Sequence, residues 1–237
     1  MNSTIKQELA GRSPLRILEK SISGGLGAGN IAVLASPKGV GKTACLVHIA
    51  ADKLMQDKPV IHVSYSARVD YIIKWYEDIF KEPAKQPGTG DALDIFEDMI
   101  RKRVIMNFNQ DGSRTEQVLK SLEAMITYGQ FAADTIIVDG FDFRTAQPEE
   151  LRSFKDFAGR LNLEIWFSAS LHGQPPFYDQ DGVPFVLKEH IEVIDVLLTL
   201  KQHAAHVNLI LVKDHGRFAP RDLRLKLDPK TLLIVNV

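Results

Sequence analysis

An octapeptide near the N-terminus carries the residue types that bind phosphate groups. Residues 36–43 read Ser-Pro-Lys-Gly-Val-Gly-Lys-Thr and match the pattern G-x-x-x-x-G-K-[ST], except that Ser36 stands where the first glycine is usual. Glycines let backbone N–H groups curl around phosphates, and a helix beginning at Gly41 would point its positive end at them. In such a loop Lys42 reaches the β- and γ-phosphates, and the Thr43 hydroxyl ligates Mg²⁺. The motif therefore predicts a P-loop that binds a nucleoside triphosphate.

The expected nucleotide contacts come from this loop and from the first turn of the helix after it. They are Ser36, Lys38, Gly39, Val40, Gly41, Lys42, Thr43 and Ala44. An apolar strand at 31–35 precedes the loop and an apolar-faced helix at 42–55 follows it, which disfavours a simple glycine turn beside a surface lysine. We expect ATP rather than GTP, because the sequence lacks the Asn/Thr-Lys-x-Asp string typical of guanine recognition.

A carboxylate at the end of a later strand completes the expected metal site. Residues 135–139 read Thr-Ile-Ile-Val-Asp, a β-branched and buried type of strand that ends in Asp139. A carboxylate in that place can bind a water molecule of the Mg²⁺ shell, with Thr43 as the second metal residue. The alternative is a turn aspartate before Gly140, since aspartate is common in turns. The presence of the P-loop favours the metal role.

The composition indicates a soluble globular chain of one large domain. Its 237 residues include 25% charged side chains, with a net charge of −1. No global field therefore draws the protein to nucleic acid or membrane. The single cysteine, Cys45, excludes an intrachain disulfide and a cysteine-based zinc cage. No apolar run approaches the ~20 residues of a membrane span, and residues 1–20 do not resemble a signal peptide, so we expect a cytoplasmic protein.

Hydrophobic runs and amphipathic stretches alternate along most of the chain. We expect an N-terminal helix in residues 1–22 and a nucleotide-binding domain in residues 23–237. Strands are predicted at 31–35, 60–64, 104–108, 135–138 and 164–168, and helices at 42–55, 69–80, from 92, at 113–128 and at 148–161. A loop at 81–91 separates two of the helices. This alternation predicts a three-layer α/β fold with a mainly parallel sheet.

The pattern changes after residue 170. A loop at 171–187 is followed by apolar runs without helical spacing at 194–200, 207–212, 223–227 and 232–235. Turn signals at 203–206, 216–221 and 228–230 predict hairpins between them. We therefore expect antiparallel strands at the C-terminal end of the parallel sheet.

A family resemblance rests on several of these segments in order. The approach Gly24-Gly25-Leu26-Gly27-Ala28-Gly29-Asn30, followed by a strand and the P-loop, resembles the RecA-like ATPases of the KaiC, RadA and DnaB branch. Residues 60–65, 135–139 and 164–168 look like the family's next strands, and 209–217 like its late strand and basic turn. The resemblance covers roughly residues 21–237. It implies a ring or filament of subunits with ATP between neighbours.

The resemblance also implies that a late basic residue reaches the γ-phosphate of the adjacent subunit. Lys213 and Arg217 occupy the matching region, and together with Lys42 they are the expected catalytic residues. A cation placed on developing phosphate charge is chemically reasonable. The alternative is a solvated hairpin tip whose charges only aid solubility.

One departure from the family concerns hydrolysis. Its members usually carry a glutamate just after the second strand, where it activates the attacking water, whereas this chain has Ser66 and Ala67. A serine hydroxyl is a poor general base near neutral pH. Asp70 and Glu77 would lie about one and three helical turns farther along. We therefore expect ATP to be bound but hydrolysed slowly or not at all.

The preferred function is an ATP-binding protein in which nucleotide occupancy controls assembly or partner binding. The alternatives are a DNA-dependent ATPase of recombination or replication and a P-loop small-molecule kinase. DNA is not favoured, although residues 101–103 are basic and the 171–187 loop carries Phe177 and Tyr178, because Asp179 and Asp181 beside them would repel a polyanion. We expect that loop to contact a protein instead. The kinase would need an arginine-bearing lid, for which no segment is evident.

Overall fold

The computed structural model describes residues 6, 10–11, 13–65, 68–84, 92–109, 114–203, 206–228 and 233–236. Its helices are α2 (Leu15–Ser21), α3 (Lys42–Met55), α4 (Val69–Ala84), α5 (Ala92–Arg101), α6 (Thr115–Glu123) and α7 (Pro148–Leu161), with a π-helical turn η1 (Ala124–Tyr128) and a 3-10 helix η2 (Phe185–His190). Its strands are β1 (Ile31–Pro37), β2 (Val60–Ser64), β3 (Arg103–Asn107), β4 (Thr135–Asp139), β5 (Glu164–Leu171), β6 (Val196–Gln202), β7 (Val207–Asp214), β8 (Arg217–Leu227) and β9 (Ile234–Asn236).

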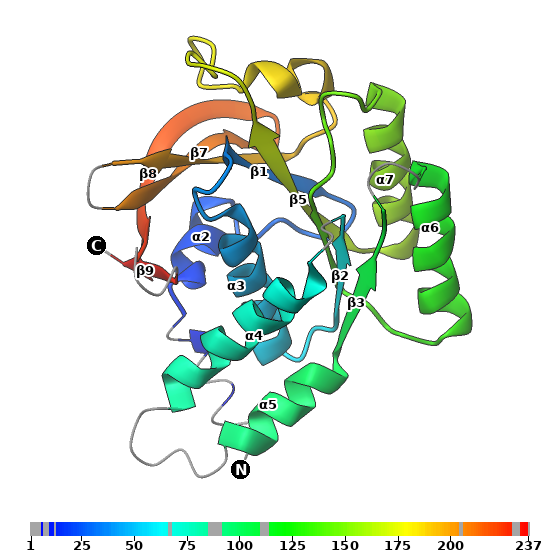
Figure 1. The fold of residues 1–237 in the computed structure, drawn as a ribbon. Coiled ribbons are helices and arrows are strands. Elements are labelled where there is room, and N and C mark those ends of the chain that lie inside the picture. The colour runs from blue at the N-terminus through cyan, green and yellow to red at the C-terminus, as the bar shows by residue number, and fades with distance from the viewer. Residues whose placement is uncertain are drawn as a thin grey trace.

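The described strands form one nine-stranded sheet in the order β3-β2-β4-β5-β1-β6-β7-β8-β9 (Figure 1). All pairs from β3 to β6 are parallel, so the carboxyl ends of these strands share one edge of the sheet. The pairs from β6 to β9 are antiparallel. Strand β5 lies between β1, which leads into the P-loop, and β4, which ends at Asp139.

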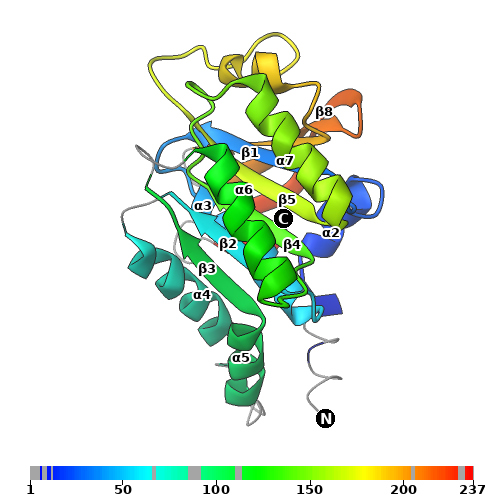
Figure 2. The same ribbon diagram turned by 90° about the vertical axis from the view of Figure 1, so that its right-hand side faces the viewer.

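Helices cover both faces of the sheet and make two separate cores. Helices α2, α3, α4 and α5 bury their apolar faces on one side, where Leu46, Leu54 and Tyr76 are fully buried. Helices α6 and α7 cover the other side, and Figure 2 shows them next to each other in front of the strands. The three-layer α/β architecture is therefore as predicted. Among the described residues, no helix combines the length and apolar character that crossing a bilayer requires.

Several predicted boundaries need correction. Strand β6 pairs in parallel with β1, so the antiparallel part begins only at β7. Strand β8 begins at Arg217 rather than at Leu223, because residues predicted as a turn pair with β7. The 3-10 helix η2 falls in and after the predicted 171–187 loop, and α4 continues to Ala84 into the predicted 81–91 loop.

The N-terminal segment packs on the rest of the chain where it is described. Leu15 and Leu18 of α2, together with Ile22, belong to the same core as α3. The Arg16 guanidinium also donates to the Asp52 carboxylate on α3. The division into residues 1–22 and 23–237 stays a prediction, and much of the predicted helix before residue 13 lies outside the described residues.

The core under α7 allows a test of the fold. Phe154 is fully buried, and its ring lies 5.1 Å from that of Phe167 and 5.9 Å from that of Phe141 in edge-to-face contacts. We expect Phe154→Ala to lower the free energy of unfolding by about 3–5 kcal/mol, because it removes buried surface and leaves a cavity. Urea denaturation measures this loss. Tyr128→Ala is the control, since Tyr128 is 85% exposed and should change little. Equal effects of the two substitutions would contradict this packing.

Candidate functional site

The P-loop leaves the carboxyl end of β1 and turns directly into α3. Gly39 and Gly41 have φ angles of 84° and 116°, a left-handed conformation that glycine adopts without steric cost. At Gly41 a side chain would also meet Leu227 Cδ1 at 3.1 Å. Helix α3 begins at Lys42, so its free N–H groups face the loop. The local geometry is therefore that of an anion-binding turn at a helix N-terminus.

The Lys42 ammonium lies inside this turn. It is buried and donates hydrogen bonds to the carbonyl oxygens of Ser36 at 2.9 Å and Pro37 at 3.0 Å. Burial lowers the pKa of Lys42 to about 8, although the negative charge of Asp139 opposes this shift. Two neutral carbonyls do not compensate a buried cation as an anion would. The site thus favours an anionic ligand next to Lys42.

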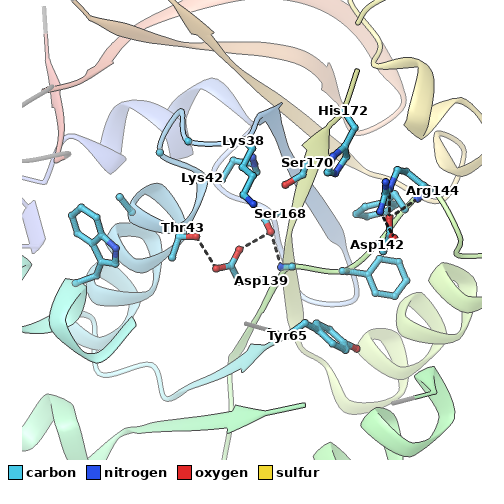
Figure 3. A pocket seen from close by; sticks show the side chains of 17 residues that line it. Lys38, Lys42, Thr43, Tyr65, Asp139, Asp142, Arg144, Ser168, Ser170 and His172 are labelled. Carbon is cyan, nitrogen blue, oxygen red and sulfur yellow. Dashed lines mark hydrogen bonds and ion pairs between the residues drawn. The ribbon is translucent and has the colours of Figure 1, made fainter. Parts of the chain in front are cut away.

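A chain of hydrogen bonds joins α3, β4 and β5 beside the lysine (Figure 3). The Thr43 hydroxyl donates to Asp139 Oδ2 at 2.8 Å, and the Ser168 hydroxyl donates to Asp139 Oδ1 at 2.6 Å. The Gly140 N–H in turn donates to Ser168 Oγ at 2.9 Å. Thr43 and Asp139 therefore present a hydroxyl and a carboxylate oxygen side by side. Such hard oxygen ligands suit Mg²⁺.

These groups line a cavity of about 490 Å³. One wall consists of P-loop residues 38, 39 and 41–44. The opposite wall consists of residues 139–144 together with Ser168, Ser170 and His172, and the cavity is also lined by Tyr65 and Trp75. Ser36 and Val40, both predicted contacts, are buried and do not line it. Their backbone groups remain part of the loop.

Sequence reasoning missed the polar residues that come from β5 and from the segment after β4. Ser168 orients the Asp139 carboxylate, as described above. It could have been found, because the predicted strand 164–168 ends at this serine and parallel strands bring their carboxyl ends together. Arg144 forms a forked pair with Asp142, with Nε–Oδ1 and Nη2–Oδ2 distances of 2.9 and 2.8 Å. This pairing contributes most to lowering the pKa of Asp142.

The structure separates Lys213 and Arg217 from the cavity. Arg217 pairs with Asp214, Asp214 with Val196, and Val196 with Ala32 at the beginning of β1. The P-loop follows the other end of β1, about 17 Å away along the strand. Neither side chain is therefore brought to the P-loop of its own chain.

The two basic side chains of this turn differ in environment. Lys213 is buried, and its ammonium donates to the carbonyl oxygens of Ile191 and Ile194, both at 2.6 Å. Burial lowers its pKa, against the nearby charges of Asp195 and Glu192. Arg217 is exposed, and no residue in the described ranges makes a hydrogen bond or ion pair with its guanidinium. Of the two, Arg217 is the side chain that is available to another molecule.

Other predicted features lie partly or wholly outside the described structure. Ser66 and Ala67, on which the hydrolysis argument rests, are not among the described residues. Asp70 and Glu77 are described, and neither lines the cavity. Among the described residues the carboxylates that line it are Asp139 and Asp142, both already engaged as given above.

The segments weighed for nucleic-acid contact make internal contacts instead. The Lys102 ammonium pairs with Asp57 at 2.7 Å and Asp98 at 3.1 Å, and the Arg103 guanidinium lies 4.3 Å from the centre of the Tyr76 ring. In the 171–187 loop, Phe177 and Tyr178 are half-buried against the core under α7. These residues are therefore poorly placed to stack on bases.

The comparisons with known proteins show the fold alone. No protein-family model matches the sequence, and no curated protein matches it. Among solved structures, the ATPase domain of a DnaB-like helicase aligns with a TM-score of 0.67 and 14% identity, covering 99% of this chain and 96% of that one. The predicted RecA-like P-loop fold is therefore confirmed. In all, 505 solved chains match, so a widely shared fold cannot by itself select an activity.

The buried ammonium of Lys42 predicts a pH dependence of nucleotide binding. Because the pKa of Lys42 is lowered to about 8, the side chain loses its proton as pH rises through that value. An anionic phosphate would favour the protonated form, so binding above about pH 8 should take up a proton and weaken by up to about tenfold per pH unit. Calorimetry of Mg·ATP binding in buffers of different ionisation enthalpy measures the uptake. Lys42→Arg, whose guanidinium stays charged, should abolish it, and unchanged uptake in this variant would assign the proton elsewhere.

Proposed function

We propose that this chain is an ATP-binding protein related to the KaiC, RadA and DnaB branch, in which nucleotide occupancy controls assembly or partner binding. The observation that carries the proposal is the Thr43–Asp139–Ser168 chain next to buried Lys42, inside a cavity whose described carboxylates are already engaged. Such a site is equipped to hold a phosphate chain and a metal ion. It lacks an evident group to activate water.

The residues of the site divide the binding work between them. The N–H groups of the loop around Gly39 and Gly41 and the ammonium of Lys42 would hold the phosphates, exchanging two carbonyl partners for anionic oxygens. Thr43 and Asp139 would hold Mg²⁺, which when bound supplies positive charge against the phosphate oxygens. Ser168 keeps the Asp139 carboxylate oriented toward Thr43. These roles support ATP and Mg²⁺ as ligands.

Weak hydrolysis follows from how the two cavity carboxylates are used. Asp139 accepts hydrogen bonds from Thr43 and Ser168, and Asp142 accepts the forked pair from Arg144. A general base must be free to accept a proton from the water that it activates. Both carboxylates are held by other donors, and Ser66 has no carboxylate to offer. Bound ATP would thus persist and act as a signal of occupancy.

A phosphate-release assay with Mg·ATP tests this proposal. We expect the wild-type protein to be nearly silent and Ser66→Glu to gain at least about tenfold in turnover, because a positioned general base typically contributes about 10²–10⁴-fold. Ser66→Gln is the matched control, since it has the same length without the carboxylate. Adding Lys42→Ala to Ser66→Glu should remove the gain. Brisk turnover by the wild type would show that another group activates water.

The exposed Arg217 supports a site that is completed between copies of the chain. It lies at the sheet edge opposite the P-loop, so it can serve only a neighbour. We expect Arg217→Ala in the Ser66→Glu background to lower turnover by about 10²-fold, as for loss of a charge-stabilising donor. Lys213 should matter less directly, because its ammonium is bound within its own chain.

A mixing experiment tests whether Arg217 acts between copies. In the Ser66→Glu background, the Lys42→Ala and Arg217→Ala proteins should each be inactive. Mixed in equal amounts, they should recover activity at about a quarter of the contacts, where an intact cavity meets an intact Arg217. No recovery at concentrations where the copies associate would contradict a shared site. Stimulation of the wild type by added DNA would instead favour the DNA-dependent ATPase.

A further inference from the structure

The imidazole of His215 lies between two hydrogen-bond acceptors at the turn joining β7 and β8. Its Nδ1 is 2.7 Å from Asp214 Oδ1, and its Nε2 is 3.0 Å from the carbonyl oxygen of Leu26. A neutral imidazole has only one N–H, whereas an imidazolium has two. A carboxylate and a carbonyl can only accept. Both hydrogen bonds therefore exist together only when His215 is protonated.

The charges around His215 favour that protonated form. Partial burial lowers its pKa, but the hydrogen bonds to Asp214 and Leu26 and the charges of Asp214 and Asp195 outweigh this and raise it above the ordinary value. Asp195 lies just before β6, and its carboxylate is paired with Lys155 of α7 at 2.5 Å. From β7 the neighbouring cation is Lys213. The glycine segment contributes the Leu26 carbonyl and the Ser23 hydroxyl, which is 3.5 Å from Asp214 Oδ2.

The two segments that His215 joins have few other means of holding each other. The glycine segment, residues 24–29, leads into β1, and Gly24, Gly25 and Gly27 adopt φ angles of 101°, 127° and 79°. Glycines offer no side chains for packing, so a hydrogen bond to the Leu26 carbonyl is a direct way to fix the segment. The turn on the other side holds Arg217, two residues after His215. The His215 N–H also donates to the Asp195 carbonyl at 2.8 Å.

We infer that His215 is a positioning residue which, as an imidazolium, ties the β7–β8 turn to the glycine segment and thereby fixes the direction of Arg217. The tie itself is independent of nucleotide, whereas the role of Arg217 rests on the proposed function. Since the side chain is 33% exposed, its proton exchanges with solvent. The tie is complete below the ordinary histidine pKa and is lost as pH rises through the raised value. The turn is therefore fixed at lower pH and released at higher pH.

An NMR titration of the histidine side chains tests the tie directly. Nitrogen-15 spectra distinguish an imidazolium from either neutral tautomer, and His215→Asn assigns the signal. Asn suits this exchange because His215 has φ 44°, in the left-handed region that Asn tolerates. We expect a midpoint above the ordinary value of about 6.5, and a lower midpoint in Asp214→Asn. His48 is an internal control, since burial lowers its pKa to about 4 and its Nδ1 accepts from the Ile234 N–H. A His215 midpoint at or below the ordinary value overturns the inference.

Hydrogen exchange and the pH profile of the shared site test the consequence. At one pH below the His215 midpoint, the amides of residues 24–29 should exchange about five- to tenfold faster in His215→Asn than in wild type. In the Ser66→Glu background, turnover should fall as pH rises through that midpoint, and His215→Lys, a cation across this range, should retain turnover at higher pH. The same pH profile in His215→Asn as in its parent overturns the positioning role. If Arg217→Ala changes nothing while His215 titrates as expected, the shared site has failed and the positioning role falls with it.

Discussion

The insertion of β5 between β1 and β4 is the constraint on which the site depends. It separates the strand that carries the P-loop from the strand that ends in Asp139 by one full strand. The Thr43 hydroxyl nevertheless reaches Asp139 at 2.8 Å, because α3 crosses over the sheet and starts at the shared edge. Ser168 on the inserted strand holds the other carboxylate oxygen. Three elements distant in sequence are thus locked by one side chain, and a shift of any of them would break the chain.

Local patterns were enough to predict the parts of the site that depend on short segments. The P-loop follows from eight contiguous residues, and Asp139 from an apolar run that ends in a carboxylate. The helices at 42–55 and 148–161 and the strand at 60–64 were predicted with the observed bounds, because capping residues and apolar runs mark their ends. These features need no knowledge of which strands are neighbours.

The features that sequence reasoning missed depend on pairing between distant strands. The hairpin signals after residue 200 indicated antiparallel neighbours, but β6 joins β1 in parallel, which only the crossover from β5 determines. Arg217 and Arg221 were predicted in a turn, yet their backbones pair with β7. The burial of Lys213 depends on two carbonyls at 191 and 194, in a segment without regular spacing. Ser168 was within reach of sequence reasoning once the order of the strands was considered.

The position of Arg217 at the sheet edge opposite the P-loop gives any contact between the two edges a direction. Such a contact joins two different surfaces, so it is heterologous, and an open assembly built from it has two unlike ends. One terminal subunit displays an empty cavity and the other an unused Arg217. A copy with Arg217→Ala could then be joined through its cavity but could not extend the assembly through its arginine. Small amounts of that copy would act as chain terminators, with an effect set by their ratio to intact copies.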